Sequence, residues 1–97
     1  MEVRPRMEDY GNFPIQLFCV VSTQGELTPL QFRYEDEEHT IHTVRIHRVL
    51  SHKSVQHAGS KAILYTCTAC LEKEQETYFE IKYLIDRHKW IFSGRLS

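Results

Sequence analysis

The stretch YFEIKYLI, residues 78–85, decides the fold class of this chain. Large apolar side chains occupy its odd positions and alternate with polar ones at Glu80 and Lys82. A period of two is typical of a strand that buries one of its faces. Residues 86–88 then form a polar turn that leads into a second apolar run at 89–92. The end of the chain therefore predicts two antiparallel strands.

The same pattern recurs toward the N-terminus. Residues 63–71 place apolar side chains at every second position, and the charged run 72–76 forms the following turn. Residues 30–35 also alternate, with Leu, Phe and Tyr at 30, 32 and 34 on the expected buried face. Pro29 places the start of that strand at a sheet edge or at its first residue. A polar connection at 36–39 has the right length for a hairpin.

The segment 40–50 alternates imperfectly, because its apolar residues are spaced by three, two and then three positions from Ile41 to Val49. A step of three predicts a bulge, which bends a strand. A helix is the alternative, since positions 41, 44, 45 and 48 share a helical face. Two arginines on that face and several β-branched neighbours favour a strand. The polar segment 51–61 predicts a long loop, with one short helical turn as the alternative.

Residues 15–22 are apolar on both faces, so this strand needs cover on both sides. Six short strands joined mainly by short turns predict a single all-β domain. It is either a curved antiparallel meander or a small SH3-like or OB-like barrel, with at most one short helical turn. We place this domain at 15–93, between a flexible N-terminal arm at 1–14 and a tail at 94–97.

Composition indicates an ordinary globular chain. The 97 residues are 41% hydrophobic and 26% charged, and the formal net charge is −1. We find no secretory signal and no apolar run long enough to span a bilayer, which predicts a cytoplasmic protein without a membrane partner. Three cysteines are too few for a secreted disulfide scaffold.

Cys67-Thr-Ala-Cys70 is the one motif with known chemistry, because two such cysteines can bind zinc. Six histidines, at positions 39, 42, 47, 52, 57 and 88, are the candidates for the remaining ligands. In an alternating strand, however, Cys67 and Cys70 point to opposite faces, and no second pair follows. We therefore assign no metal and no cofactor, and keep a zinc-binding domain as an alternative.

The charge pattern offers a second alternative. Residues 39–71 contain no Asp or Glu and lie between two acidic turns. A basic sheet surface with an aromatic residue can bind a phosphate backbone and stack bases. The candidate residues for a nucleic-acid-binding barrel are Arg45, Arg48, Lys53, Lys61 and Tyr78.

The favoured interpretation is a non-enzymatic interaction module that forms a homodimer. No serine has the context of a nucleophile, no glycine-rich phosphate loop occurs, and the acidic residues cluster in turns. Apolar residues on the expected outer faces would leave a patch exposed, and such patches mark partner surfaces. The candidate self-association residues are Phe18, Val20, Leu64, Leu84 and Ile91.

The run Leu30-Gln-Phe-Arg-Tyr34 through Val49-Leu50, together with Lys89-Trp90-Ile91-Phe92, resembles small bacterial proteins of unknown function. In those proteins a strand beginning F-R-Y leads to a V-L strand, a Y-x-C or Y-x-V strand and a K/R-W-x-F/L hairpin. The resemblance implies the same kind of sheet and no catalytic residue. This chain departs from the pattern in its His-containing segment 51–61.

Overall fold

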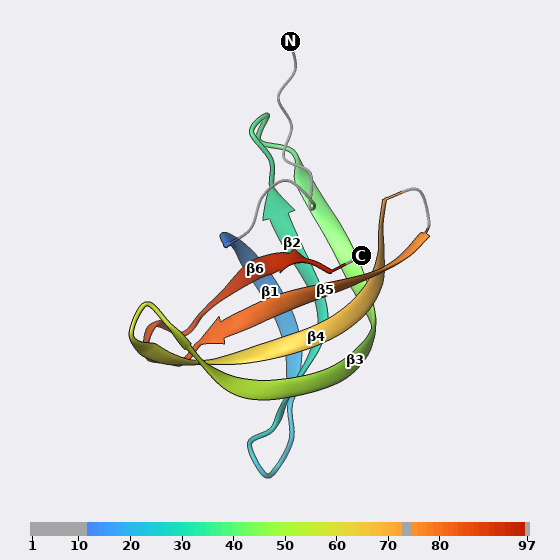
Figure 1. Ribbon diagram of the computed structural model, residues 1–97. Helices are drawn as coiled ribbons and strands as arrows, with labels where there is room; N and C mark the ends of the chain where they lie inside the picture. Colours follow the sequence, from blue (N-terminus) through green and yellow to red (C-terminus); the bar gives the residue numbers. More distant parts are fainter. Residues whose placement is uncertain (1–11, 73–74, 97) are drawn as a thin grey trace.

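The computed structural model describes residues 12–72 and 75–96. They form six antiparallel strands that close into a barrel in chain order, with the last strand pairing back onto the first (Figure 1). Within these residues the single helical element is the 3-10 turn η1 (Ile85–Arg87), and no helix has the length and apolarity to cross a membrane. The all-β prediction is confirmed, and the barrel is the architecture formed.

The strands differ in length and extend past the expected domain limits. Their bounds are β1 (Phe13–Val21), β2 (Leu27–Glu35), β3 (Ile41–His57), β4 (Ser60–Glu72), β5 (Gln75–Leu84) and β6 (Lys89–Arg95). The first strand begins before residue 15 and the last ends after residue 93, so Gly94 lies inside β6. Most of the expected arm, residues 1–11, lies outside the described residues.

Three phenylalanines from different strands meet in the barrel interior. Phe32, Phe79 and Phe92 are fully buried, and their ring centroids lie 5.6 to 5.9 Å apart. Rings at this spacing pack in tilted or offset contacts, and each buried ring contributes about 2–3 kcal/mol by leaving water. The alternating pattern thus predicted Phe32, Phe79 and Ile81 as core residues, whereas Leu30 and Ile85, expected on the same buried faces, are exposed. The other buried core residues are Val44, Ile46, Tyr65, Cys67, Ala69 and Ile81.

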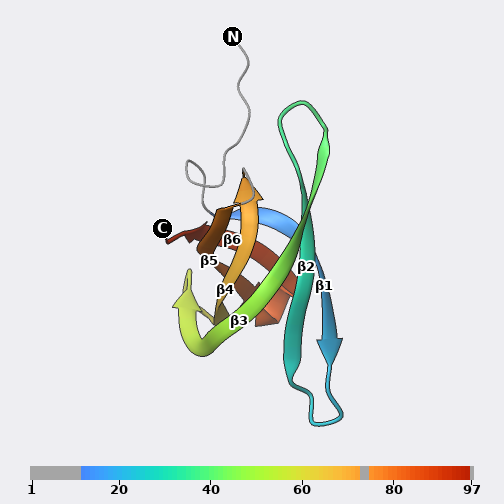
Figure 2. The same ribbon diagram turned by 90° about the vertical axis from the view of Figure 1, so that its right-hand side faces the viewer.

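The long strand β3 belongs to two sheets. Its first part, 41–45, pairs with β2, while from Ile46 onward it pairs only with β4. Register shifts between Ile46 and Arg48 and between Val49 and Ser51 mark bulges, which bend a strand. The bend carries β3 away from β2, and the far ends of β1 and β2 project as a two-stranded ribbon (Figure 2).

Only one of the two expected bulge positions is correct. The step from Ile46 to Val49 contains a bulge, but the step from Ile41 to Val44 does not. Ile41 pairs regularly with Glu35 and is 55% exposed, while Val44 is buried, so the two residues face opposite sides of an unbroken ladder.

The predicted loop at 51–61 is wrong. β3 continues to His57, β4 begins at Ser60, and only Ala58 and Gly59 form the turn. Both turn residues have positive φ, 51° and 83°, which matches the twist of a two-residue hairpin. The segment reads as a loop because much of this hairpin is exposed, so it lacks the apolar alternation of a half-buried strand.

Candidate interaction surfaces

The outer side of β1, β2 and the first part of β3 forms one exposed surface, called the Phe18 face below. The ladder sets Phe18 opposite Gln31 and Gln31 opposite Arg45, so one row crosses all three strands. A neighbouring row runs through Arg33. The Phe18 face comprises Gln16, Phe18, Val20, Thr28, Leu30, Gln31, Arg33, Thr43 and Arg45.

A register shift gives this face its apolar centre. The ladder between β1 and β2 passes from Phe18 opposite Gln31 to Cys19 opposite Pro29, which leaves Leu30 as the extra residue. Leu30 is 46% exposed, so the expectation that it shares the buried face of Phe32 is wrong. A proline cannot donate to a ladder and is tolerated at a bulge, which accounts for the irregularity beside Pro29.

Arginines complete the Phe18 face. The Arg33 guanidinium carbon lies 5.4 Å from the centroid of the Phe18 ring, a cation–π arrangement that holds the ring against the sheet. Arg45 lies across Gln31 in the next strand. None of these nine residues is Lys, Asp or Glu, and Glu35, at the margin of the face on the outer side of β2, is bound to His39. Enrichment in Arg and aromatic residues with depletion of Lys, Glu and Asp is typical of protein interfaces.

The five predicted self-association residues do not share one surface. Phe18 and Val20 are exposed on the Phe18 face, and Leu64 is half-buried on β4. The expectation that Leu84 and Ile91 are exposed is wrong, because both are buried in a small second cluster. That cluster forms where Val55 and Ala62, near the end of the β3–β4 hairpin, pack against them.

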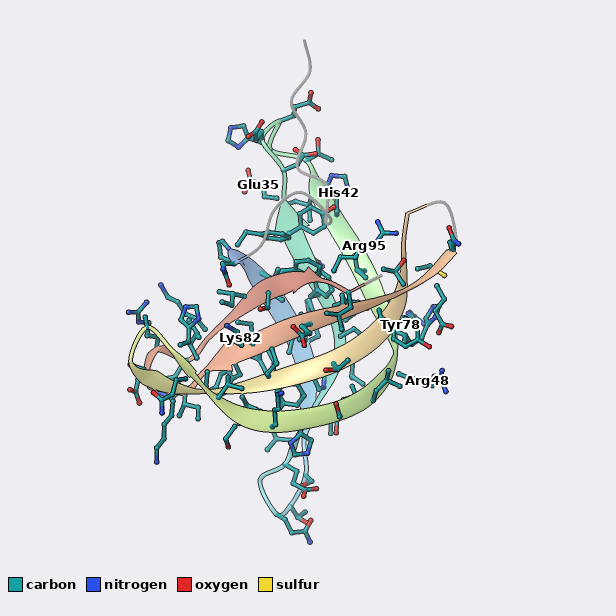
Figure 3. The ribbon with its side chains drawn as sticks, in the orientation of Figure 1. Glu35, His42, Arg48, Tyr78, Lys82 and Arg95 are labelled. Atoms are coloured by element: carbon teal, nitrogen blue, oxygen red, sulfur yellow. The ribbon has the colours of Figure 1, made fainter. Side chains whose placement is uncertain are left out.

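The five predicted nucleic-acid residues are also divided. Arg48 and Tyr78 lie in one row across β3, β4 and β5, with Thr68 between them, on the outer flank seen in Figure 3. Lys53 lies further along the same side of β3, opposite Leu64. Arg45 belongs to the Phe18 face and Lys61 lies near the tip of the β3–β4 hairpin, so the set does not form one basic surface.

Thr68 occupies an unusual position in that row. Its side chain is fully buried although it lies on the outer side of the barrel, and its hydroxyl has no hydrogen-bond partner among the described residues. Glu76 and Glu80 lie on β5 on either side of Tyr78. The row therefore contains one guanidinium group, from Arg48, and one exposed aromatic residue, Tyr78, with acidic residues next to it in the sequence of β5.

The cysteine pair lacks the arrangement that zinc needs. Cys67 is fully buried in the core, and burial raises the pKa of its thiol to about 12, whereas a zinc ligand must be a thiolate. Cys70 is exposed and lies opposite Glu76. Across residues 12–72 and 75–96, no three His, Cys, Asp or Glu side chains are grouped for a metal ion.

The histidines are dispersed, each in a separate contact. His39 binds Glu35 at 2.6 Å. Each of the other five contacts a different side chain: His42 with Asp36, His47 with Glu76, His52 with Tyr65, His57 with Lys82 and His88 with Tyr83. The histidines that are close in the sequence therefore do not form a cluster in space. Four of them are spread along the length of β3, and the fifth, His39, lies in the turn before it.

Asp36 organises the β2–β3 turn. One carboxylate oxygen accepts hydrogen bonds from the backbone N–H groups of Glu38 and Thr40, and the other binds the His42 ring at 2.7 Å. The His42 ring stacks on Tyr34 with centroids 4.8 Å apart. The hydrogen bond to His42 and those to the backbone lower the pKa of Asp36 from 3.8 to about 2. These contacts hold the turn in place.

Comparison with protein-family models, curated proteins and solved structures gives no match for this chain. The resemblance to small bacterial sheet proteins therefore stays a prediction. Sequence reasoning placed Arg33 on the outer side correctly but did not list it among the candidate site residues, and it missed Leu30 as a surface residue. The signal for Leu30 was Pro29 within an alternating run, since such a proline is typical of a bulge.

Proposed function

We propose that this protein is a non-catalytic interaction module that forms a homodimer through the Phe18 face and the neighbouring edge of β1. One observation carries the proposal: Phe18, Val20 and Leu30 are 39%, 52% and 46% exposed and lie together beside that edge. Contiguous exposed apolar side chains on a small domain are typical of a partner surface.

The edge of β1 adds backbone groups to the apolar patch. β1 pairs with β6 only over residues 13–15, so 16–21 have no strand on that side among the described residues. An unpaired strand edge presents N–H and C=O groups that can pair with another chain. Phe18 and Val20 lie on this edge strand itself, so one contact would cover both the side chains and the edge.

A second copy of the chain is the partner that best fits these features. Two β1 strands related by a two-fold axis at Cys19 would pair antiparallel, so that each Phe18 lies opposite the Val20 of the second copy. In such a dimer the two copies of Arg33, each on β2, are separated by three strand spacings, or about 14 Å. At this distance salt largely screens the repulsion between their charges. A formal net charge of −1 adds little repulsion between copies.

Sedimentation velocity from about 10 to 500 μM tests the proposal. We expect the mass to rise from one chain toward two as concentration increases. Val20→Lys puts a charge into the patch and should raise the dimer dissociation constant at least tenfold. Ile41→Lys is the matched control, since Ile41 is equally exposed, at 55%, but lies on β3 away from the β1 edge.

Two results would contradict the dimer. One is a wild-type chain that stays monomeric at the highest concentration. The other is an equal effect of Val20→Lys and Ile41→Lys, which would mean that overall charge and not this edge controls association.

Binding of single-stranded nucleic acid is the second candidate function. It is favoured by the row that sets Arg48 across Thr68 from Tyr78, a residue that is 41% exposed. Bases can stack on such a ring while the guanidinium binds phosphate. Fluorescence anisotropy with a labelled oligonucleotide should show binding that weakens with salt and with Arg48→Ala. Binding that is insensitive to both changes would exclude this surface.

A further inference from the structure

A cleft of about 730 Å³ opens where β3 bends away from β2. Residues of the β1–β2 turn and the start of β2 line one side, and residues of β3, β4, β5 and η1 line the other. Most of its lining is apolar or aromatic, from Leu27, Val49, Ile63, Tyr65, Tyr83 and Ile85. A cleft of this volume with an apolar lining is typical of a binding site.

The floor of the cleft is rigid and aromatic. Tyr65 and Tyr83 both pack against Trp90, with ring centroids 5.4 and 4.9 Å away. The Tyr83 hydroxyl also binds the His88 ring at 3.1 Å, which fixes the outer end of the side chain. Packed rings of this kind keep their positions and offer a preformed surface to an apolar group.

Unpaired backbone borders the cleft on both sides. The ladder between β2 and β3 ends at Gln31 opposite Arg45. Beyond it, residues 27–30 pair only with β1, and residues 46–57 pair only with β4, among the residues that the structure describes. The N–H and C=O groups of such edges can be paired by a ligand that carries its own N–H and C=O groups at the spacing of a β-strand. A polypeptide in extended conformation is such a ligand.

We propose that this cleft binds an extended peptide segment of another protein as an added strand along the free edge of β3, between Ile46 and Lys53. Alternate side chains of the peptide point inward, toward Val49 of β3 and Leu27 of β2, and are apolar. The added strand continues the sheet of β5, β4 and β3 across the open end of the barrel.

Charge specifies the peptide further. Glu26 lies at the rim, is exposed, and forms no ion pair with any described residue. Its carboxylate thus favours a lysine or arginine at one end of the peptide. A second hollow of similar volume lies beside the β2–β3 turn, but there Glu35 is bound to His39 and Asp36 to His42. The cleft combines an aromatic floor with the free edges of 27–30 and 46–57.

The test uses the full chain carrying Val20→Lys, which separates this site from the dimer edge. The probe is acetyl-Lys-Val-Thr-Phe-Thr-Val-Lys-amide, followed by amide chemical shifts in nuclear magnetic resonance. We expect saturable shifts in residues 27–30 and 46–53. Glu26→Lys should weaken binding at least fivefold and Ile85→Asp at least tenfold, while Ile41→Lys, exposed but outside the cleft and its free edges, should leave it unchanged.

The same peptide with alternate backbone amides methylated tests strand addition directly, because it keeps its side chains but cannot complete a ladder. We expect it to bind at least tenfold more weakly. Equal binding of the two peptides, shifts confined to another face, or no shift at 1 mM probe would each overturn the proposal. None of these results bears on the dimer, which is measured on the wild-type chain without peptide.

Discussion

Asp36 shows how one buried carboxylate makes a turn sensitive to pH. Its pKa in the folded protein, about 2, lies below the ordinary value of 3.8 because His42 and the backbone N–H groups of Thr40 and Glu38 bind the ionised form. A depressed folded-state pKa stabilises the native state fully above the unfolded pKa. That contribution is lost as the pH falls from about 4 toward 2.

We therefore predict that Asp36→Asn lowers the free energy of unfolding at pH 7, and that its difference from wild type shrinks as the pH falls from 4 to 2. Urea unfolding across this range is the measurement. Glu37→Gln removes a charge from the same turn without removing the bonds to Thr40 and His42, and so reports the effect of charge alone. A difference that stays constant down to pH 2 would show that Asp36 does not titrate as argued.

Thr68 is a second residue whose chemistry has a measurable consequence. Its buried hydroxyl lacks a hydrogen-bond partner among the described residues, and such a group costs about 1–3 kcal/mol of desolvation. Thr68→Val keeps the shape and removes that cost. We predict a gain of about 1 kcal/mol, or a rise in Tm of about 4–8 °C for a domain of this size.

Thr77→Val is the matched control for this gain. Thr77 is also buried, but its hydroxyl donates to the backbone carbonyl of Gln75 at 3.2 Å. Its removal should destabilise the protein by about 1 kcal/mol. Equal effects of the two substitutions in thermal unfolding would indicate that the Thr68 hydroxyl is satisfied in solution.

Among the elements, the β3–β4 turn depends on two residues in the left-handed region. A Cβ added at Gly59 meets nothing within 4 Å, so the cost of substitution there comes from its φ of +83° and not from crowding. We predict that Gly59→Ala costs about 1 kcal/mol. Ala58→Asn should instead stabilise by up to about 1 kcal/mol, because Asn adopts positive φ more readily than Ala. Denaturant unfolding measures both, and the same sign for the two changes would contradict a two-residue turn of this type.

This turn also shows why the sequence predicted some elements and not others. Strands 30–35, 63–71 and 78–85 line the barrel with one face, so their alternation was visible and the core at Phe32, Phe79 and Phe92 followed. The β3–β4 hairpin has no such pattern, because much of its end is exposed. Its remaining signal was the Ala58-Gly59 pair, which is weaker than Asn-Gly.

The interaction surfaces were less predictable than the core. Exposure of Phe18 and Val20 followed from alternation in β1, but Leu84 and Ile91 alternate in the same way and are buried. What covers them is the curled end of another hairpin, a long-range contact that no local pattern encodes. Likewise Arg33 and Arg45 become neighbours of Phe18 only through the register of three strands.

At the scale of the whole molecule, the bend in β3 has two consequences: the barrel closes, and some strand edges stay unpaired. The two bulges in β3 turn its second half toward β4. This allows β6 to meet β1 over 13–15, but among the described residues it leaves 16–21, 27–30 and 46–57 without a second neighbouring strand. A protein that avoids edge pairing usually places charges or prolines on such edges. Here the free edge strand β1 instead carries two exposed apolar residues, Phe18 and Val20.

Amide hydrogen exchange can therefore distinguish the free edge of β1 from the free edge of β3 in a single protein. At low concentration we predict fast exchange for amides that point away from the ladders in 16–21 and 46–53, and slow exchange around Phe79 and Phe92. Raising the concentration should protect 16–21 alone, because dimer formation covers only the β1 edge. Adding the acetylated peptide should protect 46–53 alone. Protection of both edges by either treatment would mean that the two edges respond to one event. The dimer edge and the peptide cleft would then not be independent sites.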